Sequence, residues 1–123
     1  MVIALMIKPG EHPTITMLCD TAEYLNHAIS LGSDEICFAQ ARRLENGLAI
    51  LHADSCASFG FSANRKVNGK LISGTFYIVG VAAGKLRSLT DREISKYTAQ
   101  FWQAESYTED EVLEAWLDEI AEL

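Results

Sequence analysis

The chain has 123 residues, of which 49% are hydrophobic and 22% are charged, and its formal net charge is −7. This length suits one domain with its own core, and the composition excludes an intrinsically disordered chain. No apolar run approaches the roughly 20 residues that a membrane helix needs. The start of the chain also lacks the basic leader and the cleavage pattern of a signal peptide. We therefore expect a single cytoplasmic domain that does not enter a membrane.

The negative charge is concentrated at one end of the chain. Residues 1–102 hold nine acidic and ten basic residues, so this part is close to neutral. Residues 103–123 hold eight acidic residues and neither Lys nor Arg. The sequence therefore predicts an α+β body over residues 1–102 and an acidic C-terminal segment over residues 103–123.

The first part of the body predicts a hairpin followed by a helix. Residues 2–8 and 14–18 are short apolar runs separated by Pro and Gly residues, a pattern typical of two paired strands. Asp20 or Thr21 can cap a helix with apolar side chains at helical spacing, and Gly32 can end it. We expect this helix to lie on one face of the sheet.

The second part of the body predicts further strands. Residues 35–42 alternate apolar and polar side chains, and residues 48–54 follow the dipeptide Asn46-Gly47, which favours a tight hairpin turn. Residues 55–70 are rich in small, turn-forming and basic residues, so we expect a long surface loop there. Residues 71–81 form the strongest predicted strand, and we expect both of its faces to be buried.

Two further helices are marked by capping boxes, in which a Thr and a Glu three residues later exchange hydrogen bonds with the backbone. These are Thr90 with Glu93 and Thr108 with Glu111. The second helix has an apolar stripe, which consists of Val112, Leu113, Trp116, Leu117 and Ile120. We expect this stripe to pack on the body and the opposite, acidic face to stay in solvent. The fold class is thus α+β, with an antiparallel or mixed sheet of about five strands packed by three helices.

Several separated motifs, in the same order along the chain, resemble those of one protein family. The motifs are Ile7-Lys8-Pro9-Gly10, Gly60-Phe61-x-x-Asn64-Arg65, Ile72-x-Gly74-Thr75-Phe76-x-Ile78-Val79-Gly80 and Ser88-Leu89-Thr90-Asp91-x-x-Ile94-x-Lys96-Tyr97. Together they span most of residues 1–102. This chain resembles an uncharacterised family of small bacterial proteins that is common in phages and integrative elements. The resemblance implies a mobile-element setting and no particular activity.

One spacing in the chain matches a nucleophilic catalytic set. His52, Asp54 and Cys56 are two residues apart, so on a continuing strand they would project from one face, as a base, an orienting group and a nucleophile do. The strand pattern ends near Ser55, however. We therefore interpret His52 as a histidine at a strand end and expect no catalytic residues.

No metal or cofactor site is predicted. Cys19, Cys37 and Cys56 are odd in number, widely spaced and without a C-x-x-C pair, so we interpret them as reduced, mostly buried side chains. His12 has no further ligands at metal spacing.

The basic cluster in residues 55–70 offers a candidate ligand site. It consists of Asn64, Arg65, Lys66, Asn68 and Lys70. A guanidinium suits carboxylate or phosphate groups, so Asn64 and Arg65, with His52, are the candidate ligand-binding residues. The alternative interpretation of this segment is a solvated loop whose aromatic residues anchor it to the core.

Two functions of different class follow from these patterns. The leading hypothesis is a non-enzymatic protein-binding accessory protein of a phage or mobile element, which contacts its partner through the acidic helix face of Glu109, Asp110, Glu114, Asp118 and Glu122. The alternative is a small enzyme or binder of an anionic ligand that uses residues 52–70. The near-neutral body argues against nucleic-acid binding. The sequence leaves open whether the C-terminal helix closes the core or forms a homodimer.

Overall fold

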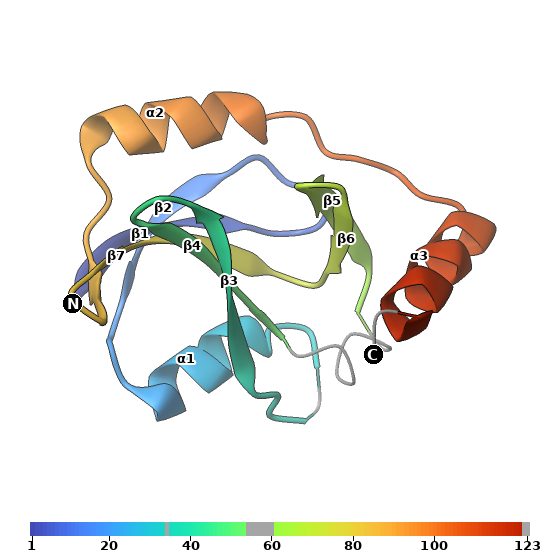
Figure 1. Ribbon diagram of the computed structural model, residues 1–123, viewed down its shortest axis with the longest axis horizontal. Helices are drawn as coiled ribbons and strands as arrows, with labels where there is room; N and C mark the ends of the chain where they lie inside the picture. The colour runs from blue at the N-terminus through green and yellow to red at the C-terminus, as the bar shows by residue number, and fades with distance from the viewer. Residues whose placement is uncertain (34, 54–60, 122–123) are drawn as a thin grey trace.

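An antiparallel sheet forms the centre of the computed structural model, which describes residues 1–33, 35–53 and 61–121 (Figure 1). The strand order is β2 (Thr14–Leu18), β1 (Val2–Ile7), β7 (Phe76–Ala82), β4 (Leu48–Ala53) and β3 (Ala39–Glu45), with β8 (Lys85–Arg87) paired to β7. All of these pairs are antiparallel. A separate hairpin is made by β5 (Ala63–Val67) and β6 (Lys70–Ser73).

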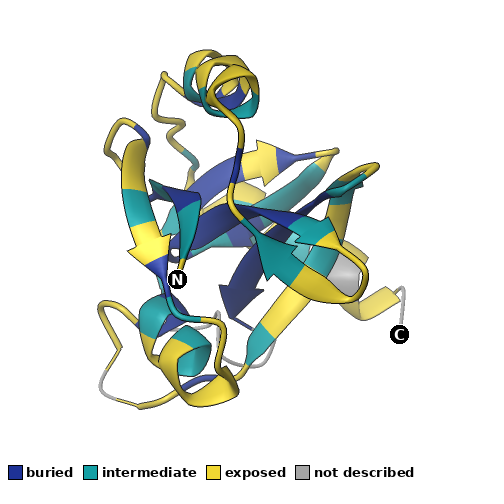
Figure 2. Cartoon of the chain, turned by 90° about the vertical axis from the view of Figure 1, so that its left-hand side faces the viewer, coloured by how far each residue is buried: buried dark blue, intermediate teal, exposed yellow. Residues whose placement is uncertain are grey.

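The two faces of the sheet are covered by different elements. Helix α1 (Ala22–Ile29) packs on one face, where it meets small and aliphatic side chains such as Ala4, Leu51 and Val79. Helix α2 (Asp91–Gln100) and the β5–β6 hairpin cover the other face. This division follows from the alternation of side chains along each strand, which sends neighbouring residues to opposite faces. Figure 2 shows the buried residues gathered in the strands between the two helices.

Strand β7 is the middle of both core layers. Phe76 and Ile78 point toward α2, whereas Tyr77 and Val79 point toward α1, and all four side chains are buried. The Tyr77 hydroxyl donates a hydrogen bond to the Ala28 carbonyl at 2.9 Å, which ties α1 to the sheet. Burial raises the pKa of Tyr77 to about 12. The prediction of a strand that is buried on both faces is confirmed for this segment.

The capping boxes predicted from the sequence are present. The Thr90 hydroxyl accepts from the Glu93 amide at 3.2 Å, and the Glu93 carboxylate accepts from the Thr90 amide at 2.9 Å. Arg87 adds two hydrogen bonds to the same carboxylate, at 2.8 and 3.0 Å. The Arg87 side chain lies over Gly80, where an added Cβ would stand within 2.5 Å of it. A glycine at this position in β7 therefore makes room for the arginine that holds the start of α2.

The predicted fold class is confirmed, with three helices and a sheet of six strands where about five were expected. Two strand boundaries were wrong. The strand expected at residues 35–42 begins at Ala39 and continues to Glu45. The strand expected at residues 71–81 is interrupted at Gly74, whose φ of 77° turns the chain from β6 into β7.

The prediction of a surface loop over residues 55–70 was wrong where the structure describes that segment. Residues 54–60 lie outside the described residues, and β5 and the first residue of β6 occupy much of the remainder. Asn68 and Gly69 form the turn, with φ values of 50° and 82°. Two consecutive positive φ angles are typical of the tight hairpin turn that Asn-Gly favours. Asn68-Gly69 is thus the same turn signal as Asn46-Gly47, and it joins β5 to β6.

Helix α3 (Glu109–Ala121) lies at the end of an extended linker and beside β6, apart from the two core layers (Figure 1). Its capping box is present, because Thr108 and Glu111 exchange hydrogen bonds at 2.9 and 3.2 Å. No described residue of α3 belongs to either hydrophobic cluster. The helix is therefore outside the core that stabilises the rest of the chain.

The Arg87–Glu93 pair predicts a defined pH dependence of stability. Hydrogen bonds from Arg87, followed by the backbone amide of Thr90, lower the pKa of Glu93 from 4.5 to about 2. Because the folded-state pKa is the lower one, the contribution is present above about pH 4.5 and is lost as the pH falls toward 2. Glu93→Gln should lower the free energy of unfolding by ~2 kcal/mol at pH 7, after allowance for the partial solvent exposure of the pair.

The measurement is urea unfolding at several pH values. The difference between the natural protein and Glu93→Gln should shrink toward zero near pH 2. Asp91→Asn is the matched control, because Asp91 lies in the same helical turn and forms no ion pair within the described part of the chain. A difference for Glu93→Gln that does not change with pH would contradict the assignment.

Candidate functional site

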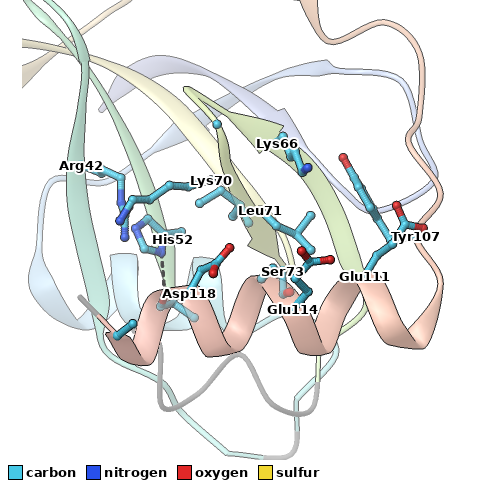
Figure 3. Close-up of a pocket in the computed structure, with 15 residues that line it drawn as sticks. Arg42, His52, Lys66, Lys70, Leu71, Ser73, Tyr107, Glu111, Glu114 and Asp118 are labelled. Atoms are coloured by element: carbon cyan, nitrogen blue, oxygen red, sulfur yellow. Dashed lines mark hydrogen bonds between the residues drawn. The ribbon is translucent and has the colours of Figure 1, made fainter. Parts of the chain in front are cut away.

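A cavity of about 460 Å³ lies between α3 and the β5–β6 hairpin, with the far ends of β3 and β4 forming one wall (Figure 3). Basic side chains from four different strands line it. They are Arg42 of β3, His52 of β4, Lys66 of β5 and Lys70 of β6. Figure 3 shows Arg42, His52 and Lys70 pointing toward the same end of the cavity. Arg42 and Lys70, which are 28 positions apart in the sequence, are thus brought to one site.

The register of the β3–β4 hairpin places Arg42 and His52 on one face. Gln40 pairs with His52, and Arg42 pairs with Ile50. Directly opposed residues share a face, as do residues two apart on one strand, so Arg42 and His52 are diagonal neighbours. His52 is only 6% exposed, and its Nδ1 donates to the Ala53 carbonyl at 2.6 Å. This hydrogen bond fixes the proton on Nδ1 and the orientation of the ring.

The opposite wall of the cavity is acidic and comes from α3. Glu111, Glu114 and Asp118 line it, and Tyr107 stands at the end nearest Lys66. The Lys66 ammonium lies 5.8 Å from the centre of the Tyr107 ring, and the Lys66 amide donates to the Glu105 carboxylate at 3.0 Å. Hydrogen bonds from Thr108 lower the pKa of Glu111, and the positive charge of Lys66 contributes in the same direction. The linker that precedes α3 is thus joined to β5 at Lys66.

The apolar stripe of α3 does not face the body as expected. Leu113, Leu117 and Ile120 are 50%, 57% and 58% exposed, whereas Val112 and Trp116 are half-buried. The expectation that the whole stripe packs on the body was therefore wrong for Leu113, Leu117 and Ile120. The acidic residues Glu109, Asp110, Glu114 and Asp118 are exposed, as expected. The half-buried residues of α3 are Val112, Ala115 and Trp116, so the helix rests on the body with only part of its stripe.

The acidic residues that were expected to bind a partner are exposed where the structure describes them, and these are Glu109, Asp110, Glu114 and Asp118. Glu114 and Asp118 also line the cavity, whereas Glu109 and Asp110 at the start of α3 do not. Glu122 lies outside the described residues.

Asn64 and Arg65 lie inside the protein, although the sequence predicted that they would face a ligand. Both are 0% exposed. The Arg65 guanidinium donates to the carbonyls of Lys8, Glu11 and Gln103, and to the Asn64 side-chain oxygen at 2.7 Å. Desolvation by burial lowers the pKa of Arg65. Neither residue lines the cavity.

Asn64 completes this internal network. Its side-chain amide donates to the carbonyl of Ile7 at 3.0 Å and to that of Gly74 at 2.7 Å. All five of these carbonyls belong to loops or to a strand end, where the Asn64 and Arg65 side chains supply donors to them. The role of the Asn-Arg pair in this structure is to join elements of the body.

The cavity is concave and lined by charged side chains. Within the described residues, these side chains do not form a catalytic set. His52 lies in the cavity wall, and Asp54 and Cys56 lie outside the described part of the chain. Among the described residues, no group of three or more His, Cys, Asp or Glu side chains could hold a metal ion. Cys19 and Cys37 are free thiols, and Cys37 is buried.

Comparison with protein-family models, with curated proteins and with solved structures finds no match to this chain. No helix in the described ranges is both long enough and apolar enough to span a membrane.

Local sequence signals exist for two cavity residues that the sequence analysis does not name as site residues. The Asn46-Gly47 turn sets the register of the β3–β4 hairpin, which places Arg42 beside His52. The capping box of Thr108 and Glu111 places Glu111 in the first turn of α3. Nothing in the sequence predicted Tyr107 as a cavity residue, since its place depends on the path of the linker.

The buried position of Arg65 predicts a large loss of stability on substitution. Arg65→Met should lower the free energy of unfolding by ~3 kcal/mol, because several buried carbonyls lose their donor together. Arg43→Met, which replaces an exposed arginine on β3, should change it by less than ~0.5 kcal/mol. Urea unfolding followed by far-UV circular dichroism measures both. If both substitutions change the free energy of unfolding by the same small amount, Arg65 does not join the elements of the body.

The outward position of the α3 stripe predicts that its side chains contribute little to folding. Leu117→Ser should change the free energy of unfolding by less than ~0.5 kcal/mol, because Leu117 is mostly exposed. Phe101→Ala should cost ~3 kcal/mol, because Phe101 is buried and packs edge-on against Phe76. If Leu117→Ser costs as much as a core substitution, the stripe is packed against this chain after all.

Proposed function

We propose that this protein is a non-enzymatic binding protein that inserts the apolar stripe of α3 into a groove on another protein. The observation that carries the proposal is the outward orientation of Leu113, Leu117 and Ile120. A surface helix usually buries its apolar stripe, whereas α3 leaves these three side chains mostly in solvent. Such a stripe is typical of a binding surface.

The spacing of the stripe supports a helix-in-groove contact. Leu113, Leu117 and Ile120 stand at positions i, i+4 and i+7, and Trp116 at i+3 flanks them. These are the anchor positions by which amphipathic helices bind apolar grooves. Trp and Leu anchors in such contacts bury large apolar areas when they enter a pocket.

The charges beside the stripe favour a partner whose groove has a basic rim. Glu109 and Asp110 are exposed next to it, and residues 103–123 contain no basic residue. Lys or Arg side chains on the rim would attract this helix and orient it. A second copy of the chain is a poorer occupant, because pairing two α3 helices would set acidic residues against acidic residues.

The family resemblance supports the biological setting of this proposal. It implies a small accessory protein of a phage or integrative element, so the partner would be a cytoplasmic protein of the host or of the element. The engagement of the Asn64 and Arg65 side chains within the body supports a binding role over an enzymatic one.

The test is site-specific cross-linking in the cells that produce the protein. A photo-cross-linking amino acid replaces Leu113 in one version and the exposed Arg43 in the other. The captured protein is then purified, and its affinity for the full chain is measured directly. We expect capture only from position 113 and a loss of affinity of about 100-fold for Leu113→Ser/Leu117→Ser/Ile120→Ser, since anchor residues dominate such interfaces.

A matched control keeps the apolar stripe and changes charge elsewhere. Glu23→Gln/Glu35→Gln removes two exposed carboxylates of the body and should leave the affinity unchanged. Equal capture from both positions, or full affinity of the triple Ser variant, would overturn the proposal. A dimer of the natural protein that the triple Ser variant converts to a monomer would overturn it in favour of a second copy.

A further inference from the structure

The cavity beneath α3 has an uneven distribution of charge. Its basic side chains, Arg42, Lys66 and Lys70 with His52, all come from the body. Its acidic side chains, Glu111, Glu114 and Asp118, all come from α3. Among the described residues, the body contributes no carboxylate to this cavity. Without α3, the described part of the body would therefore present a concave basic surface.

The helix that neutralises this surface is not part of the core. No described residue of α3 belongs to either hydrophobic cluster, and none is fully buried. Leu113, Leu117 and Ile120 are mostly exposed, and Val112 and Trp116 are half-buried. A helix that buries so little apolar surface leaves the body more easily than α1 or α2, whose side chains belong to the clusters. The α3 carboxylates therefore stand where the anionic groups of a ligand would bind.

We propose that this surface is a binding site for a small ligand with several phosphate groups, and that the carboxylates of α3 occupy the site until the ligand displaces them. The site has the parts that such a ligand needs. Arg42 provides a guanidinium fork that matches two phosphate oxygens, and Lys66 and Lys70 provide ammonium groups. This inference does not depend on the proposed partner, because it uses the inward face of α3 and not the outward stripe.

The dimensions favour a ligand the size of a nucleotide over a nucleic-acid strand. A cavity of about 460 Å³ falls within the range of small-molecule sites. A strand would need basic side chains that continue beyond the cavity. The next arginine along β3, Arg43, lies on the opposite face of that strand from Arg42. Residues 1–102 as a whole are nearly neutral.

The experiment is isothermal titration calorimetry of full-length proteins with inorganic tripolyphosphate. The cavity variant is Glu111→Gln/Glu114→Gln/Asp118→Asn, in which Gln at 111 can still complete the capping box. The matched control is Glu23→Gln/Glu109→Gln/Asp110→Asn, which makes the same change in net charge at exposed positions outside the cavity. We expect affinity about tenfold higher than natural in the cavity variant and within about twofold of natural in the control.

A second set of variants tests the basic side chains. Arg42→Gln and Lys70→Gln, each added to the cavity variant, should lower its affinity for tripolyphosphate at least about tenfold. Lys66→Gln gives a third, independent substitution on the same surface, and circular dichroism confirms that each protein is folded.

Several results would overturn the inference. An equal gain in the control would mean that net charge alone governs binding. Unchanged affinity after the basic substitutions would place the phosphate elsewhere. Binding of a 20-nucleotide single strand without binding of tripolyphosphate would show a polymer site. The triple Ser variant separates this inference from the proposed function. If it loses partner binding but binds tripolyphosphate as the natural protein does, the two sites act independently.

Discussion

The arrangement of the molecule around its candidate sites depends on one buried arginine. Arg65 has no carboxylate within ion-pair distance among the described residues, and backbone carbonyls and one amide oxygen surround its charge. A buried cation is costly unless such dipoles replace water. The carbonyl oxygens of Lys8, Glu11 and Gln103 accept hydrogen bonds from Arg65, which holds these three segments close together. Because Gln103 begins the linker to α3, this contact fixes where the linker leaves the body.

The interactions that stabilise the chain differ before and after Gln103. The body is stabilised by two apolar layers that share β7, and its helices α1 and α2 are pinned by caps, by Tyr77 and by the stacking of His12 on Trp102. Helix α3 contacts β6, and its half-buried residues are Val112, Ala115 and Trp116, with no described residue fully buried. The free energy gained from apolar burial grows with the area removed from water. The two parts therefore differ in stability, and the acidic helix is the part that is easiest to displace.

The elements of the fold were largely predictable because local signals agree with the tertiary structure. Capping boxes and Asn-Gly turns depend on a few neighbouring residues, so Thr90, Thr108 and Asn46 predicted their elements correctly. The roles of Asn64 and Arg65 were not predictable in this way, because their partners are up to 57 positions away in the chain. The prediction that the whole α3 stripe is buried was wrong for a related reason. Periodicity identifies an apolar stripe, but the linker decides where the helix meets the body, and Leu117 is left exposed while Trp116 is half-buried.

The two proposed sites lie on opposite sides of one helix, and this has a thermodynamic consequence. A partner can bind the outward stripe of α3 while the helix stays on the body. In that case the α3 carboxylates continue to line the basic cavity. A partner whose groove surrounds the helix must draw the carboxylates of Glu111 and Asp118 away from the body, which opens the cavity. In the second case, any anion that binds the cavity better without α3 would also strengthen partner binding, by the same factor in both directions. The length of helix that the partner covers thus determines whether the two sites are independent or coupled.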